Sequence, residues 1–112
     1  MLGSIERQET LQRELARILS ILRKEYEPES VYLFGSASAG LVTDDSDLDV
    51  LIVKETEARW LDRIKEVLLL TRPQAAVDFF VLTPAEWKQA RRDDPFFREE
   101  VYEKGRLVHG AP

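Results

Sequence analysis

Apolar residues near the start of the chain recur at spacings of three and four, with charged residues between them. This spacing places the apolar side chains on one face of a helix. We therefore expect an amphipathic helix over residues 5–26, which Pro28 ends. The apolar positions of this helix are Leu11, Leu15, Ile18, Leu19, Leu22 and Tyr26.

Three short apolar runs follow, at residues 31–34, 47–54 and 76–82. Their length and their content of valine, isoleucine and aromatic residues predict strands. The second run opens with two aspartates and the third carries one, Asp78. Residues 106–109 are a further candidate, which we expect to form an edge strand.

Helical signals separate and follow these strands. Apolar spacing predicts a helix over residues 60–71, ending before Pro73. Residues 83–86 read Thr-Pro-Ala-Glu, a capping box with proline at the first helical position. Residues 94–95 start another helix, and Gly105 stands where a C-cap glycine belongs. Four aromatic side chains at helical core spacings are expected in the core: Trp60, Trp87, Phe96 and Phe97.

This order of elements predicts an α/β (α+β) fold, with a small mixed β-sheet and helices packed against it. The 112 residues suffice for one domain, 1–112, made of an N-terminal helix (1–28) and a core (31–110). The leucines of the first helix belong either to that core or to a partner interface.

Composition narrows the classes of function. The chain has 16 basic and 21 acidic residues, a net charge of −5, which argues against direct nucleic-acid binding. There is no cysteine, so a disulfide framework and a thiolate metal site are both excluded. No signal peptide and no membrane-length apolar run is visible, and we expect a cytoplasmic protein.

The charges within the predicted strands carry the chemistry. Asp47 and Asp49 alternate along one strand, so they point the same way, about 6.5–7 Å apart. Asp78 joins them if its strand is adjacent. Carboxylates that converge in apolar surroundings repel one another unless a cation lies between them. Two Mg²⁺ ions about 3.5–4 Å apart are a common solution for displacement at phosphorus. Asp44 and Asp45, in a polar turn, are expected to be solvated.

Gly35 and Ser36 follow the first strand and predict a phosphate-sized turn. Glycine permits a tight turn and a close approach of phosphate to the main chain. If residues 36–41 form a helical turn, its free N–H groups and the Ser36 hydroxyl can face an anion. Ser36 is alternatively a helix cap, which uses the same N–H groups.

Leu-Phe-Gly-Ser at residues 33–36, ten intervening residues, Asp-Leu-Asp-Val at 47–50 and the later strand residue Asp78 resemble the DNA polymerase β-type nucleotidyltransferase superfamily. The length resembles its minimal members. The resemblance implies that Asp47, Asp49 and Asp78 are catalytic metal ligands for Mg²⁺. It also implies that Gly35 and Ser36 bind the triphosphate of the donor, ATP.

The resemblance also implies a reaction and a partner. A nucleoside monophosphate, AMP from ATP, would pass to a hydroxyl of a partner protein as pyrophosphate leaves. Minimal members often act as antitoxins beside a HEPN-domain toxin, which implies a hetero-oligomer. Two alternatives stay open: a binding module that neutralises its partner by docking, and a transferase that acts on a small molecule, which usually needs a further substrate domain.

One feature departs from the family pattern. Many relatives have arginines just after the Gly-Ser pair, where this chain has Ala-Ser-Ala at residues 37–39. Arginine there would offset the charge of the triphosphate. The departure predicts weak nucleotide binding, dependence on the cations of a partner, or replacement by another basic residue of this chain. The candidates in the sequence are Lys54, Arg59, Arg63, Arg91 and Arg92.

Overall fold

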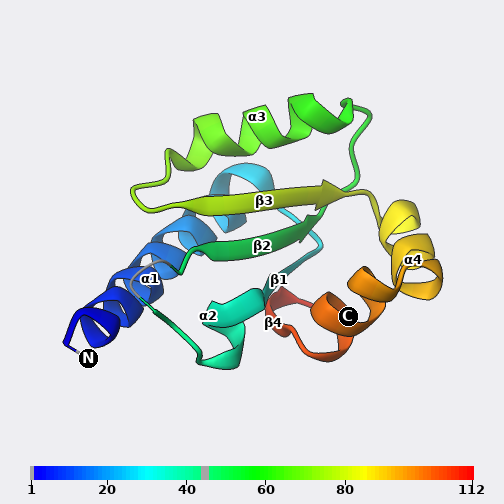
Figure 1. Ribbon diagram of the computed structural model, residues 1–112. Coiled ribbons are helices and arrows are strands. Elements are labelled where there is room, and N and C mark those ends of the chain that lie inside the picture. Colours follow the sequence, from blue (N-terminus) through cyan, green and yellow to red (C-terminus); the bar gives the residue numbers. More distant parts are fainter. Residues whose placement is uncertain (1, 44–45) are drawn as a thin grey trace.

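The computed structural model describes residues 2–43 and 46–112, with side chains from residue 5 onward. Figure 1 shows helices packed around a small twisted sheet. In chain order the elements are α1 (Leu2–Ile21), the π-helical turn η1 (Leu22–Tyr26), β1 (Ser30–Phe34), α2 (Gly35–Ala39), β2 (Leu48–Val53), α3 (Trp60–Thr71), β3 (Val77–Leu82), α4 (Pro84–Asp93), the π-helix η2 (Phe96–Glu103) and β4 (Arg106–Gly110).

The four strands lie in the order β3-β2-β1-β4. β1 runs antiparallel to both β2 and β4, whereas β2 and β3 are parallel. The expected mixed sheet is therefore confirmed, and so is the edge strand near the C-terminus. β2 begins one residue later than expected, because Asp47 precedes the first paired residue, Leu48.

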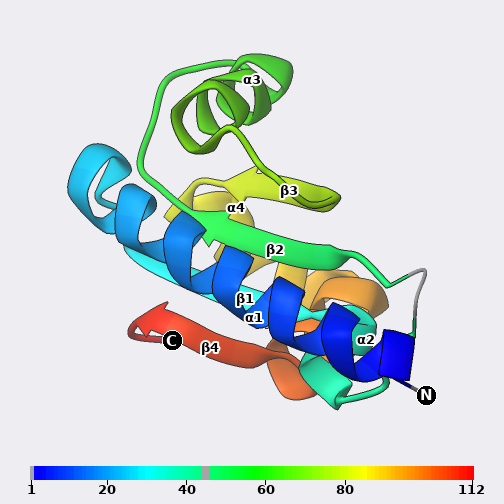
Figure 2. The ribbon, with the colours of Figure 1, turned by 90° about the vertical axis from the view of Figure 1, so that its left-hand side faces the viewer.

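Helices cover both faces of the sheet. On one face, α1 and α3 pack against alternate strand residues such as Leu33 and Leu48. On the other face, Trp87 of α4 and Val101 of η2 pack against Phe34 and its neighbours. Figure 2 shows α1 in front of the sheet, with α4 and η2 behind it. Strand side chains alternate between faces, which explains why every residue of β1 is buried.

The helix signals were largely correct. The capping box at Thr83 is present, with the Thr83 hydroxyl accepting from the Glu86 N–H and the Glu86 carboxylate accepting from the Thr83 N–H. Gly105 follows η2 as expected, but its φ is not positive, so it does not form a left-handed cap. A Cβ at Gly105 would overlap the Val101 carbonyl oxygen, and this close approach is the reason that glycine fits there.

The expected core is confirmed in part. Trp87 is 4% exposed and lies in the core, but Trp60 is 40% exposed and Phe96 is 42% exposed. Trp60 is the first residue of α3 and Phe96 is the first residue of η2. A side chain at the start of a helix is covered by neighbours on only part of its surface. Leu11 and Leu15 are buried, so they belong to the core rather than to an interface. No helix in the described part of the chain has the length and apolar content needed to cross a membrane.

Candidate active site

The sequence-predicted site residues meet at one edge of the sheet. β1 ends there and β2 and β3 begin there, because β1 runs opposite to its two neighbours (Figure 1). Asp49 pairs with Phe34 of β1 on one side and with Asp78 of β3 on the other. Gly35 directly follows Phe34. Directly paired residues share a face of the sheet, so Asp49 lies on the face covered by α4 and η2.

Gly35 lies in direct contact with Asp49. Its φ is +76°, in the left-handed region, and a Cβ built there would overlap the Asp49 Oδ2 atom and lie 3.2 Å from Cγ. Any side chain at this position would push the carboxylate away. Glycine is therefore required both by the backbone turn and by the space that the Asp49 carboxylate occupies.

The carboxylates influence one another. Burial raises the pKa of Asp49, and the negative charges of Asp78 and Asp47 and a hydrogen bond with Asp78 raise it further. Asp49 is half-buried, but Asp78 is exposed because β3 is an edge strand and Asp78 is its second residue. The apolar surroundings expected for the three acids are therefore found in part, around Asp49, and not around Asp78. The closely coupled carboxylates are Asp49 and Asp78.

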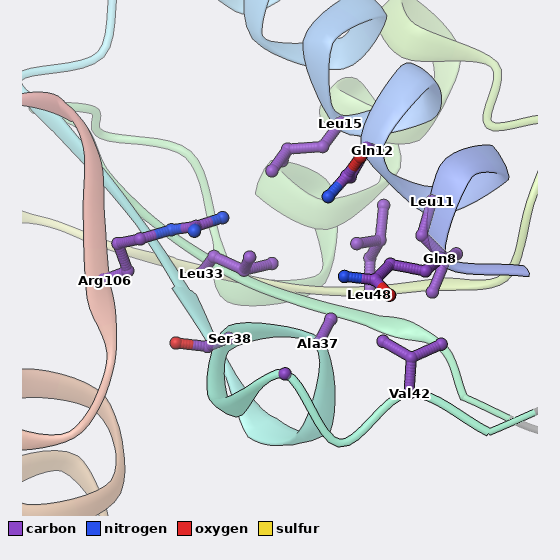
Figure 3. A pocket seen from close by; sticks show the side chains of 11 residues that line it. Gln8, Leu11, Gln12, Leu15, Leu33, Ala37, Ser38, Val42, Leu48 and Arg106 are labelled. Atoms are coloured by element: carbon purple, nitrogen blue, oxygen red, sulfur yellow. The ribbon is translucent and has the colours of Figure 1, made fainter. Parts of the chain in front are cut away.

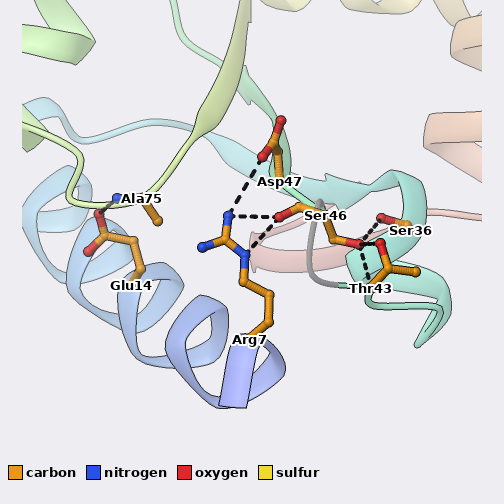
Figure 4. A network of polar contacts seen from close by, with 7 residues as sticks. All are labelled: Arg7, Glu14, Ser36, Thr43, Ser46, Asp47 and Ala75. Atoms are coloured by element: carbon orange, nitrogen blue, oxygen red, sulfur yellow. Dashed lines mark hydrogen bonds and ion pairs between the residues drawn. The ribbon is translucent and has the colours of Figure 1, made fainter. Parts of the chain in front are cut away.

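Asp47 is held by a different partner. Its side chain is 47% exposed, and its Oδ1 atom lies 3.7 Å from Arg7 Nη2 (Figure 4). Among the described residues, no three ligand-type side chains converge closely enough to hold a metal ion. The pair formed by Asp49 and Asp78 still fits Mg²⁺, which commonly takes one or two protein carboxylates and completes its shell with water and substrate phosphate.

Ser46 connects the site to its surroundings. Its Oγ accepts hydrogen bonds from the Thr43 N–H (2.8 Å) and from the Ser36 hydroxyl (3.3 Å). Its carbonyl accepts from Arg7 Nε at 3.0 Å and from Nη2 at 2.8 Å (Figure 4). Ser36 is thus inside α2 and bonded to Ser46, not the helix cap, which is Phe34. Sequence reasoning overlooked Arg7 and Ser46, because neither one belongs to a recognisable motif. Asp44 lies outside the described residues, as does Asp45.

α2 lies between two hollows. One encloses about 120 Å³ on the α1 side of the sheet (Figure 3). Leu33, Leu48 and Ser38 contribute to its wall, and Ser38 Oγ is buried without a hydrogen-bond partner. The other hollow, of about 370 Å³, is lined by Gly35, Ser36, Ala39, Leu41, Glu100 and Lys104. Because Glu100 belongs to η2, this second hollow lies between α2 and the end of η2.

Four of the five cations proposed for the triphosphate make contacts away from the Gly-Ser turn. Lys54 follows the far end of β2 and donates to the Tyr26 carbonyl. Arg63 is buried and donates to the Glu86 carboxylate at 2.6 Å. The other two contacts are Arg91 over the Tyr102 ring and Arg92 with Asp93. The fifth cation, Arg59, precedes α3, beyond that same far end.

Comparison with known protein families identifies the family of this chain. The family model described as "Nucleotidyltransferase domain" matches residues 15–108. The chain belongs to the nucleotidyltransferase domain family. Its matched region includes the Gly-Ser turn and all three predicted aspartates, so the resemblance to the polymerase β-type enzymes is confirmed.

A solved structure supports the same fold for this nucleotidyltransferase. The crystal structure of a candidate nucleotidyltransferase from Sulfolobus solfataricus matches with a TM-score of 0.70 and 25% sequence identity. The match covers 96% of this chain and 87% of the other chain. A search of curated proteins finds no significant match.

Proposed function

We propose that this nucleotidyltransferase transfers AMP from ATP, with Mg²⁺, to a hydroxyl of a partner protein, and that the partner is a HEPN-type toxin. The observation that carries the catalytic part is the carboxylate pair of Asp49 and Asp78 beside Gly35. A half-buried acid with a raised pKa, next to a second acid, gains most from a cation. The protein acceptor and the toxin rest on the resemblance to minimal nucleotidyltransferases.

Each side chain has a role in this proposal. Asp49 and Asp78 would hold Mg²⁺, with Asp47 available once it leaves Arg7. The bound cation would supply charge neutralisation at the α-phosphate. Gly35 and Ser36 would hold the β- and γ-phosphates. Asp78 is exposed, so it can receive the proton of an incoming hydroxyl.

The covalent step balances without a further reactant. The acceptor oxygen forms a bond to the α-phosphorus of ATP, and the bond from that phosphorus to the bridging oxygen of pyrophosphate breaks. The proton of the acceptor hydroxyl passes to a carboxylate and then to water. The open position of Asp78 on the edge strand leaves room for an acceptor side chain to approach.

A second candidate is a docking module that keeps the fold and neutralises a partner without transfer. Two observations favour it. Residues 37–39 lack arginine, and Asp47 is paired with Arg7 rather than with the other acids. The coupled pair of Asp49 and Asp78 opposes it, because docking alone gains nothing from two repelling carboxylates.

Labelled nucleotides distinguish these candidates. The purified protein is incubated with Mg²⁺, an extract of the source cell and α-labelled ATP, with γ-labelled ATP as the control. We expect an α-only label on a discrete protein band, which is lost when Asp47→Asn is combined with Asp49→Asn. A γ-label would indicate phosphorylation instead. The absence of protein label with all four α-labelled nucleotides would refute transfer to a protein and favour docking.

A further inference from the structure

The donor triphosphate needs a cation that the Gly-Ser turn does not contain. A nucleoside triphosphate carries several negative charges, and one Mg²⁺ ion leaves part of that charge uncompensated. The short helix after Gly35 offers only Ala-Ser-Ala at residues 37–39. We propose that Lys104, from the other end of the chain, binds the triphosphate. This inference rests on the proposed function and assigns to it a residue that no motif identifies.

Lys104 reaches the turn through strand pairing. Leu33 pairs with Arg106 in the antiparallel ladder between β1 and β4. Two residues further along the chain from Leu33 is Gly35, and two residues before Arg106 is Lys104. An antiparallel register brings such positions opposite one another. Lys104, Gly35 and Ser36 accordingly line the same 370 Å³ hollow.

The main chain at Lys104 is held firmly. Its N–H donates to the Glu99 carbonyl at 3.0 Å at the end of η2. The next residue, Gly105, packs so closely that an added Cβ would overlap the Val101 carbonyl oxygen and lie 3.2 Å from the Leu33 carbonyl oxygen. The lysine therefore starts from a fixed point beside the turn, while its long side chain remains free to extend.

The present partner of Lys104 can be exchanged. Its Nζ lies 3.0 Å from Glu100 Oε1, and the two side chains are 70% and 50% exposed. Exposed ion pairs of this kind contribute little to stability because water screens them. A phosphate group carries more charge than one carboxylate and can replace it at the lysine. Glu100 would then position Lys104 at the hollow until the nucleotide arrives.

Two other cations near the Gly-Ser turn, Arg7 and Arg106, do not line this hollow. Arg7 donates to the Ser46 carbonyl and pairs with Asp47. Arg106 lines the 120 Å³ cavity on the α1 side of the sheet (Figure 3). Among the residues that line the hollow at Gly35 and Ser36, Lys104 is the one basic side chain in the described part of the chain.

The test compares nucleotides that differ only in their phosphates. Fluorescent (mant) ATP and mant-AMP are titrated, with Mg²⁺, against wild type, Lys104→Gln, Lys104→Arg and Lys24→Gln. Lys24 is an exposed lysine on η1, so its variant removes the same charge elsewhere. We expect Lys104→Gln to raise the Kd for mant-ATP about tenfold and to leave the Kd for mant-AMP unchanged. Lys104→Arg should restore ATP affinity, and Lys24→Gln should match wild type.

Each other outcome has a definite meaning. If wild type binds mant-ATP and Lys104→Gln binds it equally well, the role of Lys104 is overturned and the proposed function stands. If Lys104→Gln weakens both nucleotides equally, or Lys24→Gln weakens ATP as much, the lysine does not recognise the triphosphate. If wild type binds neither nucleotide, the proposed function and this inference both fail.

Discussion

The contact between Gly35 and Asp49 leads to a prediction with a matched control in the same short segment. Gly35→Ala places a Cβ where the Asp49 Oδ2 atom now lies, at a residue with φ +76°. Gly40→Ala introduces the same methyl group at φ +74°, but nothing lies within 4 Å of its Cβ. The two variants therefore share the backbone strain and differ in the contact with the carboxylate.

The expected losses of stability and activity follow from the backbone strain and from the contact with Asp49. A left-handed conformation costs a residue with a Cβ about 1–2 kcal/mol, so both variants should lose about that much free energy of unfolding. Only Gly35→Ala must also displace the Asp49 carboxylate. A misplacement of about 1 Å in a reacting group can reduce a rate about 100-fold. We therefore expect Gly35→Ala to lose nucleotidyl transfer at least to that extent, whereas Gly40→Ala keeps nearly all of it.

Two measurements are needed for this comparison. Urea unfolding gives the stability of each variant, and transfer from α-labelled ATP gives the activity per folded molecule. The proposed effect of the contact between Gly35 and Asp49 is refuted if Gly35→Ala is as active as Gly40→Ala at equal stability. It is refuted equally if both variants lose activity to the same degree, because the contact with Asp49 would then have no separate effect.

Three further predictions concern stability. The hydrogen bond from Arg17 lowers the pKa of Glu14. The ionised Glu14 side chain therefore stabilises the fold above the ordinary pKa of 4.5, and this stabilisation is lost as the pH falls through the lowered pKa. Glu14→Gln should therefore cost about 1–3 kcal/mol in urea unfolding at neutral pH and much less in acid; an equal loss at both would contradict this. Arg63→Met removes the hydrogen bonds that Arg63 donates to the Ala58 and Val81 carbonyls and to the Glu86 carboxylate. It should cost about 2–4 kcal/mol of unfolding free energy and leave the affinity for mant-ATP unchanged; a changed affinity would place Arg63 in the site. Burial raises the pKa of Asp49, so metal-free wild type loses stability as the pH rises through that pKa. With a chelator present, Asp49→Asn should therefore melt at a higher temperature than wild type at neutral pH, and at the same temperature in acid. Equal melting temperatures of the two proteins at both pH values would count against the coupling of the carboxylates.

The positions of Asp49 and Asp78 are the part of the candidate site that could be predicted from the sequence. Alternation along β2 placed Asp49 on one face, and Asp78 was expected to join it if the two strands were adjacent. The observed parallel register confirms that pairing. Local patterns determined these features, because strand periodicity and turn residues are encoded within a few positions.

The position of Asp47 shows where local patterns were insufficient. Its ion pair with Arg7 joins β2 to a helix that lies about 40 residues earlier in the chain. The bonds from Arg7 to the Ser46 carbonyl span 39 residues. Nothing near Asp47 in the sequence indicates such a partner. The orientation of α1 over one face of the sheet determines it, and only the packed structure shows that orientation (Figure 2).

Lys104 was overlooked for a similar reason. The five basic residues considered from the sequence did not include Lys104, and four of those five make contacts elsewhere. The residue that does line the hollow at Gly35 depends on the register between β1 and β4. An edge strand could be predicted at residues 106–109, but its partner and its register could not.

The proposed function requires that Asp49 and Asp78 bind a divalent cation together with a nucleoside triphosphate. Electron paramagnetic resonance of Mn²⁺, with a non-hydrolysable α,β-methylene analogue of ATP, measures this directly. The analogue binds part of the Mn²⁺ by itself, so the free Mn²⁺ signal with the analogue alone is the baseline. We expect wild type to lower the signal below that baseline, and to leave the signal of Mn²⁺ without the analogue unchanged. Asp49→Asn and Asp78→Asn should each abolish that effect. An unchanged Mn²⁺ signal with wild type, or undiminished binding by both variants, would contradict binding of the cation by this carboxylate pair.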